Sequence, residues 1–441
     1  MSARKTALDA LIACRKQAAW SNGVLKDYIA RDRLDRRDAA LATRLCYGVL
    51  QHRNFLDFLL AQLLTGKIKD LHPVVRDILH MGLYQIYELD KVPDSAAVNE
   101  SVTLTKKYCR LQRSAPGLVN GVLRNAVRTK GELKQPVTLE DRYSHPQALI
   151  DLLRDYVGEE RLEPMLAANN DTPQTVVQVN TLRVTTAELV ERLAQENVCA
   201  LPHSWMPDCL ILSNTGSLEK LQAFREGLFY VQDAASRLCV MCAGLKPDAD
   251  LRVLDCCAAP GGKSFGAAIA MGGKGKLRSA DIHRHKTVLI HNGAERLGLE
   301  NILIREQDAT ENHPAWLQKM DVVLADVPCS GYGIIRKKPD IRYKNPEDME
   351  RLPSLQLRIL YKQAEYVKPG GVLMYSTCTL VKRENEDVVN TFLAHCKDFY
   401  LEPLALPEVF PKNTTGMLTL VPGEYDTDGF FIARLRRKAE V

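Results

Sequence analysis

A short apolar run that ends in a glycine turn decides the fold of this chain: LRVLDCCAAPGGK, residues 251–263. Its first four residues predict a buried strand, and its two glycines predict a turn that opens a helix. Such a turn lets the backbone approach a ligand closely, with helix amides exposed behind it. The stretch therefore predicts a nucleotide-type cofactor loop at the end of a strand in an open α/β sheet.

Two cysteine motifs lie further along the chain. DVPCSG (residues 326–331) and YSTCT (residues 375–379) each follow an apolar run that is typical of a buried strand, at residues 321–325 and 371–374. Cys329 and Cys378 are therefore expected at the carboxyl ends of strands, where open α/β sheets place their chemistry. A cofactor loop combined with two cysteines at strand ends is a specific pattern.

One reaction explains why cysteine is needed. C5 of cytosine is a poor nucleophile and does not take a methyl group directly. A thiolate that adds to C6 makes C5 enamine-like, so that C5 attacks the methyl of a sulfonium donor. A base then removes the C5 proton and the thiolate leaves, which is covalent catalysis. One cysteine is expected to be the nucleophile and the other to assist release, and spacing leaves open which is which.

These motifs resemble those of the RNA cytosine-5 methyltransferases that use S-adenosylmethionine. Over nearly the whole chain, the sequence is similar to the RsmB (Sun/Fmu) branch, which methylates a specific cytosine of 16S (small-subunit) ribosomal RNA. The resemblance implies that Cys378 is the nucleophile and that Cys329 assists product release. It also implies a cofactor site made of Cys257, Ala258, Ala259, Pro260, Gly261, Gly262, Lys263, Asp281, Asp308 and Asp326.

Three acids at successive strand ends support that site. Asp281 ends the second expected strand, where a carboxylate can bind ribose hydroxyls. Asp308 follows the third strand, near the expected place of an adenine, and Asp326 ends the fourth, beside the reacting centre, where it could hydrogen-bond the cytosine edge. The alternative is that these aspartates only cap helices or turns.

Further groups are expected beside the reactive cysteine. A free thiol has a pKa of about 8.5, so Cys378 needs a neighbouring cation, base or helix terminus. Lys263 is a candidate cation because its strand ends at the same face of the sheet. The basic segment RKKPDIRY (residues 336–343) suits a phosphate backbone and a splayed base, and an ordinary solvated loop is its alternative. The target cytosine is expected to be unpaired or flipped.

The pattern of expected elements predicts the fold class. Strands are expected at residues 251–255, 275–281, 302–307, 321–326 and 371–376, and helices at 262–270, 285–297, 347–367 and 382–395. This alternation predicts a doubly wound, mostly parallel sheet, the α/β Rossmann-like domain of class I methyltransferases, over residues 236–441. Residues 428–434 are expected to form its antiparallel edge strand. A small α+β region that assists RNA binding is expected over residues 141–235, with a possible helix cap at Thr185.

The first 140 residues are expected to form an all-α domain. Apolar residues recur at helical spacing over 41–50, 74–86 and 97–104, and residues 129–146 suggest a polar linker. Residues 1–130 hold 22 Lys and Arg against 12 Asp and Glu, so this segment carries +10 and the remainder −5. The region resembles a NusB-like RNA-binding domain. Its basic positions include Arg33, Arg36, Arg37, Lys106, Lys107, Arg110, Arg113, Arg124 and Arg128.

Composition limits the compartment and the cofactors. The 441 residues are 46% hydrophobic, with a net charge of +5 and 12 cysteines. No apolar signal region follows the first residues, and no run of about 18 apolar residues is long enough to span a bilayer. We expect a reduced, monomeric, cytoplasmic protein with free thiols. Cys239 and Cys242 have zinc-like spacing, but no second pair completes a site, so helix packing is expected and no metal.

Rival functions remain at this point. An adenine or guanine N-methyltransferase would keep the fold and the cofactor loop but would need no covalent cysteine. A noncatalytic RNA-binding or antitermination factor would explain the basic helical region and leave the cysteine motifs without purpose. An RNA cytosine-5 methyltransferase could also act on tRNA or another RNA.

Overall fold

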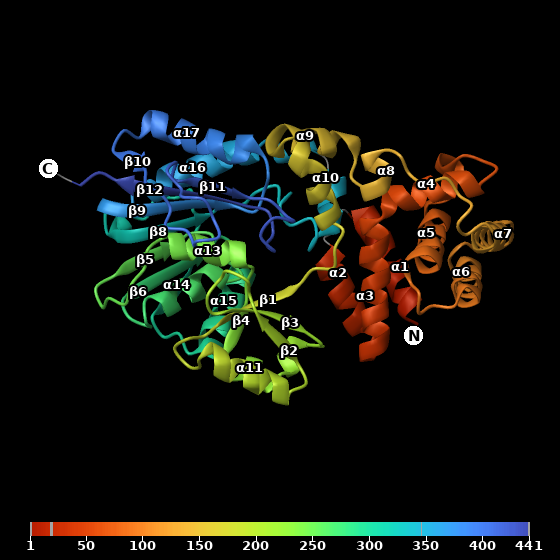
Figure 1. Cartoon of the computed structure of the whole chain (residues 1–441), viewed down its shortest axis with the longest axis horizontal. Coiled ribbons are helices and arrows are strands. Elements are labelled where there is room, and N and C mark those ends of the chain that lie inside the picture. The colour runs from red at the N-terminus through yellow and green to blue at the C-terminus, as the bar shows by residue number, and fades with distance from the viewer. Residues whose placement is uncertain (1, 18–20, 345, 440–441) are drawn as a thin grey trace. The chain divides into compact units, whose positions relative to one another are not determined.

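The computed structural model describes residues 2–17, 21–344 and 346–439. The chain divides into two compact units: Met1–Asn170 with Ile335–Lys344, and Asp171–Ile334 with Asn345–Val441 (Figure 1). The first unit therefore recruits a ten-residue segment from far along the chain. Among the described residues, none of the helices has the length and apolar character that crossing a bilayer requires. The domain boundaries expected at residues 140 and 235 stay a prediction.

The first unit is all helical, as the apolar spacing predicted. Its core centres on α5, where Ile78, Leu79 and Leu83 are fully buried. Its α-helices are α1 (Ala3–Gln17), α2 (Ser21–Asp32), α3 (Arg36–Gln51), α4 (Arg53–Leu63), α5 (Pro73–Glu88), α6 (Asp94–Tyr108), α7 (Ala115–Arg128), α8 (Leu139–Tyr143), α9 (Gln147–Val157) and α10 (Glu159–Ala168).

The expected linker at residues 129–146 is correct only in its first part: residues 130–138 contain no helix or strand and are mostly exposed, but the rest of the stretch is built into the unit. This stretch contains α8, whose N-cap Thr138 accepts a hydrogen bond from the Asp141 amide. Ser144 and His145 are fully buried, and the Ser144 hydroxyl accepts a hydrogen bond from the Phe55 amide at 2.9 Å. Polar residues suggested solvent exposure, whereas here they cap a helix and satisfy buried backbone groups.

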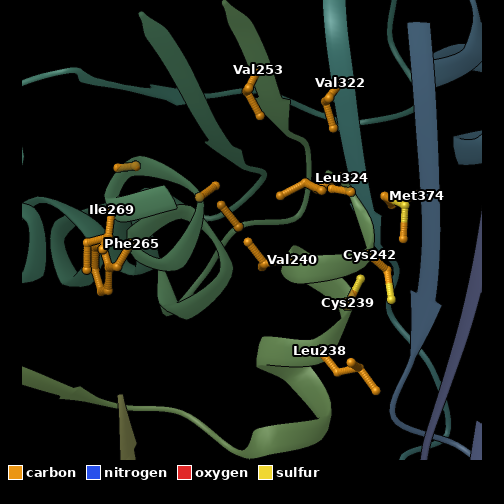
Figure 2. Close-up of a cluster of buried hydrophobic side chains, with 14 of the residues drawn as sticks. Leu238, Cys239, Val240, Cys242, Val253, Phe265, Ile269, Val322, Leu324 and Met374 are labelled. Atoms are coloured by element: carbon orange, nitrogen blue, oxygen red, sulfur yellow. The ribbon is translucent and has the colours of Figure 1, made fainter. Parts of the chain in front are cut away.

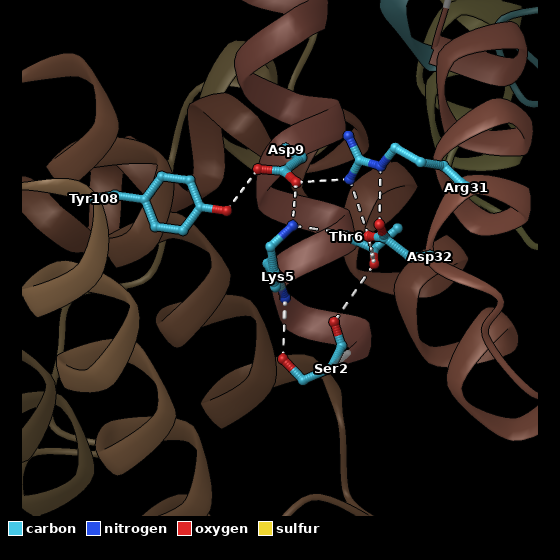
Figure 3. Close-up of polar contacts among 7 residues, drawn as sticks. All are labelled: Ser2, Lys5, Thr6, Asp9, Arg31, Asp32 and Tyr108. Carbon is cyan, nitrogen blue, oxygen red and sulfur yellow. Dashed lines mark hydrogen bonds and ion pairs between the residues drawn. The ribbon is translucent and has the colours of Figure 1, made fainter.

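An ion-pair network ties α1, α2 and α6 together (Figure 3). Asp9 accepts hydrogen bonds from Lys5 at 2.7 Å, from Arg31 at 2.8 Å and from the Tyr108 hydroxyl at 2.6 Å. Arg31 also binds Asp32, and this contact lowers the pKa of that carboxyl to about 2. Lys5 and Arg31 are thus paired with carboxylates of the same unit. By contrast, the basic side chains singled out from the sequence at positions 33, 36, 37, 106, 107, 110, 113, 124 and 128 are all exposed.

The basic segment after Cys329 corrects a second expectation. Arg342, only 2% exposed, donates to the carbonyls of residues 51, 143, 144 and 169 and to the Asn170 side chain, at 2.7–3.2 Å. The Tyr343 hydroxyl donates to the Ser144 carbonyl at 3.3 Å. Arg342 and Tyr343 therefore serve as interior groups of the helical unit, in the 3-10 turn Pro339–Tyr343, and not as an exposed phosphate site.

Replacing Arg342 with methionine should destabilise the helical unit strongly. The change leaves several buried carbonyls without a hydrogen-bond donor. Each unsatisfied buried group lowers the free energy of unfolding by about 1–3 kcal/mol. We expect a loss of about 3 kcal/mol or more, measured by urea-dependent hydrogen exchange of peptides from α3, α8 and α10. Arg342→Lys should give an intermediate loss, and Arg113→Met, at an exposed position, should change little. If these peptides in Arg342→Met were protected from hydrogen exchange as well as in the wild-type protein, the stabilising role of Arg342 would be contradicted.

The second unit begins with a small antiparallel sheet in the order β2-β3-β1-β4, covered by α11 (Thr186–Gln195). The predicted cap is confirmed: Thr185 and Glu188 form a reciprocal capping box at the start of α11. The expected α+β character of this region is also confirmed, and the region includes the short helix α12 (Gln222–Arg225). The strands are β1 (Thr175–Val179), β2 (Cys199–Pro202), β3 (Cys209–Ser213) and β4 (Phe229–Val231).

The predicted doubly wound sheet is confirmed. Its path within the described residues is β10-β12-β9-β8-β5-β6-β7, with β9, β8, β5, β6 and β7 parallel. The expected edge position of the last strand is wrong: β12 is antiparallel, but it lies between β9 and β10 and also pairs with β11. The strands are β5 (Arg252–Asp255), β6 (Lys276–Asp281), β7 (Ile302–Glu306), β8 (Met320–Asp326), β9 (Val367–Thr377), β10 (Phe399–Leu401), β11 (Met417–Leu420) and β12 (Phe430–Arg437).

Both faces of this sheet are apolar because helices cover both. Val322 and Leu324 pack on one face with α13 (Ala234–Cys242), α14 (Gly262–Ala270) and α15 (Arg284–Leu297), as Figure 2 shows in part. Val323 and Ala325 point to the opposite face, toward α16 (Leu352–Ala364) and α17 (Glu386–His395). Cys239 and Cys242, the pair with zinc-like spacing, lie buried in the first of these cores.

Candidate active site

The glycine loop joins β5 to α14 as the sequence predicted. Gly261 has a φ of +112°, in the left-handed region that favours glycine, and its amide donates to the Ala258 carbonyl at 2.7 Å. A side chain at this position would meet the ring of Phe265, 2.4 Å from the added Cβ. The loop therefore needs glycine both for its conformation and for close packing. Without a side chain at this position, the backbone of the loop is uncovered at the carboxyl end of β5.

The acids of the expected cofactor site are placed differently from one another. Asp281, at the end of β6, accepts hydrogen bonds from the amides of Ala259 at 3.3 Å and His283 at 3.0 Å, so its carboxylate lies against the glycine loop. One oxygen of Asp308 accepts from both the amide and the hydroxyl of Thr310, at 2.7 Å each. Asp308 thus caps a turn with one oxygen, as the alternative interpretation suggested.

The two cysteine motifs converge on one point. β8 and β9 are parallel neighbours, with Asp326 opposite Ser376, so their carboxyl ends lie side by side. The loops that follow bring the sulfurs of Cys329 and Cys378 to 3.2 Å from each other, and both side chains are half-buried. Two residues 49 positions apart in sequence therefore form a single thiol pair.

The Cys329 thiol resists losing its proton. The pKa of Cys329 lies well above the ordinary value, because its hydrogen bond with Cys378 and its burial both disfavour a negative charge on that sulfur.

Buried Lys263 and half-buried Asp326 form an ion pair beside these loops. The Lys263 ammonium lies 2.7 Å from Asp326 Oδ2 and 2.7 Å from the hydroxyl of Ser236, and 4.8 Å from the ring centre of Phe430. Burial alone would lower the pKa of Lys263, but the Asp326 carboxylate outweighs it and the net shift is upward. The other oxygen of Asp326 accepts from Ser376 at 2.8 Å. Lys263 therefore acts first on Asp326, and a direct effect on Cys378 stays a prediction.

Sequence reasoning missed several groups around this centre. Ser236 is a lone small hydroxyl among apolar residues of α13, and Phe430 belongs to an apolar run, so neither carries a local signal. Glu384 and Asn385 lie within the helix expected at 382–395. That helix begins only at Glu386, after a 3-10 turn (Lys382–Glu384), and both residues are fully buried.

Comparison with known proteins relates each part of the chain to a protein family. A family described as 16S rRNA methyltransferase RsmB/F matches residues 242–436, the NusB family matches 1–128, and an RsmF/B-like ferredoxin-like domain matches 145–219. The chain is 37% identical to the probable ribosomal RNA small subunit methyltransferase B of Bacillus subtilis, over 99% of both chains. The chain belongs to the ribosomal RNA small subunit methyltransferase B family. The family resemblance and the three-part fold class inferred from the sequence are thus confirmed.

Other relatives of this family extend the match. The probable ribosomal RNA small subunit methyltransferase B of Synechocystis is 34% identical, covering 99% of this chain and 100% of that one. The crystal structure of PH0851 superposes with a TM-score of 0.81 at 23% identity, covering 98% of each chain, and so shares the fold.

One buried carboxyl gives this family member a testable pH dependence. Asp255 is fully buried at the end of β5 and accepts a hydrogen bond from Ser264 at 2.7 Å; burial raises its pKa to about 7. In the unfolded chain an aspartate has a pKa of about 3.9, so between these values the folded state binds more protons. This contribution to stability is therefore complete below about pH 4 and is lost as the pH rises to about 7.

Asp255→Asn should remove this dependence, because the amide stays neutral and keeps an acceptor for Ser264. The melting temperature of the variant relative to wild type should rise between pH 4.5 and 7.5, measured by calorimetry. Asp250→Asn, at an exposed position, is the matched control and should show no such trend. If the difference in melting temperature between Asp255→Asn and wild type stayed constant across this range, the raised pKa of Asp255 in the folded state would be contradicted.

Proposed function

We propose that this chain transfers a methyl group from S-adenosylmethionine to C5 of a cytosine in 16S ribosomal RNA, through a covalent bond between Cys378 and C6 of the base. The observation that carries the proposal is the thiol pair at the carboxyl ends of β8 and β9, with sulfurs 3.2 Å apart. Membership of a family whose relatives bear the name of ribosomal RNA small subunit methyltransferase B supports the choice of RNA.

Membership of the family and the raised pKa of Cys329 support the division of roles. Burial and the contact with Cys378 hold the proton on Cys329, which suits Cys329 poorly to nucleophilic attack, and we therefore assign the attack on C6 to Cys378. After methyl transfer, the C5–H electrons re-form the C5=C6 double bond as a base takes the proton, and the Cys378 sulfur leaves as thiolate. Cys329 lies beside the bond that breaks and assists this release.

The ion pair supports a polar contact to the base. Asp326 is 31% exposed, and Lys263 and Ser376 fix both of its oxygens. Its carboxyl group is therefore held at the end of β8 and is accessible to a ligand. We assign Asp326 the recognition of the cytosine edge, and Lys263 the positioning of Asp326.

The glycine loop fits the methyl donor. Gly261 and Gly262 expose backbone where a Cβ would otherwise meet Phe265 or Gln232, and the Asp281 carboxylate lies against the same loop. Residues Cys257 to Lys263 would hold the donor with Asp281, Asp308 and Asp326. The bound sulfonium supplies an electrophilic methyl group, and the chain supplies the geometry that presents it to C5.

The helical unit supports RNA binding. Its exposed lysines and arginines on α3, α6 and α7 and their flanking turns suit a phosphate backbone, and phosphate contacts make binding dependent on salt. The target base must leave its stack to reach half-buried sulfurs, so an unpaired or flipped cytosine is the substrate. All the described cysteines are free thiols, which suits a reducing cytoplasmic environment. We propose that the protein acts as a monomer.

Cys378→Ala should abolish methyl transfer while S-adenosylmethionine still binds, because the thiol attacks the base and not the donor. We expect a loss of at least about a thousandfold in kcat, as for other removed nucleophiles. The measurement is nucleoside analysis of ribosomal RNA after incubation with labelled S-adenosylmethionine. Cys396→Ala, another half-buried cysteine, is the matched control. Turnover of Cys378→Ala within about tenfold of wild type would rule out the covalent mechanism.

Cys329→Ala should behave differently and stall after methyl transfer. The thioether between Cys378 and C6 should persist as a protein–RNA adduct that survives denaturing electrophoresis. Its formation should require S-adenosylmethionine and Cys378, so the double variant should show none. An adduct in Cys378→Ala with none in Cys329→Ala would mean that the two roles are reversed.

A further inference from the structure

The residues on either side of each cysteine are held by three buried polar side chains, Gln356, Glu384 and Asn385. We refer to these three as the loop clamp. All three are fully buried within the second unit. Gln356 comes from α16, whereas Glu384 and Asn385 come from the turn between β9 and α17. Neither the thiol chemistry nor the cofactor loop uses them.

The Cys329 loop is fixed on both sides of the cysteine. Glu384 Oε2 accepts a hydrogen bond from the amide of Ser330 at 3.0 Å. The Gln356 amide donates to the carbonyl of Pro328 at 2.9 Å and to the same Glu384 oxygen at 2.9 Å. Gln356 therefore holds the backbone immediately before Cys329, and Glu384 holds the backbone immediately after it.

The Cys378 loop is fixed in the same manner by the adjacent residue. The side-chain nitrogen of Asn385 donates to the backbone carbonyl of Thr379 at 3.0 Å. The Thr377 hydroxyl donates to the side-chain oxygen of Asn385 at 2.6 Å. The hydroxyls of Ser330 and Thr379 lie 2.6 Å apart and link the two loops directly. Two consecutive residues thus each control one cysteine.

The physical setting makes this clamp stiff. Hydrogen bonds made in a buried setting are stronger than their counterparts in water. The second oxygen of Glu384 and the amide oxygen of Gln356 have no partner among the described residues, so the stiffness comes from the bonds made by Glu384 Oε2, the Gln356 side-chain nitrogen and the Asn385 side chain. Leaving a carboxylate buried is costly unless it is hydrogen-bonded, so Glu384 resists leaving its partners. The same contacts also keep the sulfur atoms free, because they are made by residues that flank the cysteines.

We propose that Glu384 and Asn385 are positioning residues that set the separation of the Cys329 and Cys378 sulfurs, and with it the rate of the chemical step. The proposal rests on the proposed thiol mechanism, in which both sulfurs must reach the same C5–C6 bond. Loss of either residue should release one loop while the cofactor loop and the RNA-binding surface keep their structure.

The test compares Glu384→Ala, Glu384→Gln and Asn385→Ala in the full chain. A misplacement of about 1 Å can cost roughly 100-fold in rate, so both alanine variants should lose about this factor in kcat, with KM for S-adenosylmethionine and for RNA within about threefold of wild type. Glu384→Gln keeps an acceptor for the Ser330 amide and should recover to within about tenfold. Asn180→Ala is the matched control: Asn180 is a buried amide that donates to the carbonyls of Gly227 and Leu297, away from the cysteines.

A second readout does not depend on methyl transfer. Mild oxidation with diamide should join Cys329 to Cys378 in the wild-type protein, and mass spectrometry of linked peptides gives the rate. Both alanine variants should form this disulfide at least about tenfold more slowly, whereas Asn180→Ala should match wild type.

Three results would overturn the proposal: a wild-type kcat in both alanine variants, an equal loss of kcat in Asn180→Ala, or a wild-type rate of disulfide formation in both alanine variants. If the wild-type protein makes no 5-methylcytosine at all, the proposed function fails instead. The disulfide rates then still decide whether the clamp sets the sulfur separation.

Discussion

The parallel pairing of β8 with β9 is the constraint on which the site depends. Because Asp326 lies opposite Ser376, the chain must leave both strands at the same edge of the sheet, and each following loop carries one cysteine. The apolar cores on the two faces hold this register, since a one-residue slip would turn Val322 and Leu324 toward the wrong helices. The 3.2 Å separation of the sulfurs is a consequence of that register together with the loop clamp.

Charge then divides the site into two halves. Lys263 and Asp326 neutralise each other at the end of β8, so the carboxylate is held near the thiol pair without leaving an unpaired buried charge. Burial and the Cys378 contact keep the proton on Cys329. The chemistry we propose gives the two sulfurs different roles, because one must attack while the other waits for the release step.

The sequence predicted the parts of the structure whose signals are local. The glycine turn, the parallel strands, the Thr185 cap and the strand-end position of both cysteines all follow from spacing and residue type over a few positions. The role of Arg342 was predicted wrongly because a basic run is typical of a solvated or phosphate-binding segment. Only the tertiary fold shows the backbone carbonyls that accept its hydrogen bonds. The position of β12 also depends on its neighbours: a strand's own sequence does not say whether one or two strands flank it. Buried polar residues such as Glu384 and Asn385 look like helix surface until the packing is known.

The most direct test of the central claim uses small-subunit ribosomal RNA made with 5-fluorocytidine. After methyl transfer, C5 of the analogue carries fluorine and not a proton, so the release step cannot proceed and the enzyme stays attached. With wild-type protein and S-adenosylmethionine, we predict a stable protein–RNA adduct whose nucleotide is mapped by mass spectrometry to the peptide containing Cys378. An adduct mapped to Cys329, or methylated product from unmodified RNA with no adduct from the analogue, would contradict the covalent role of Cys378.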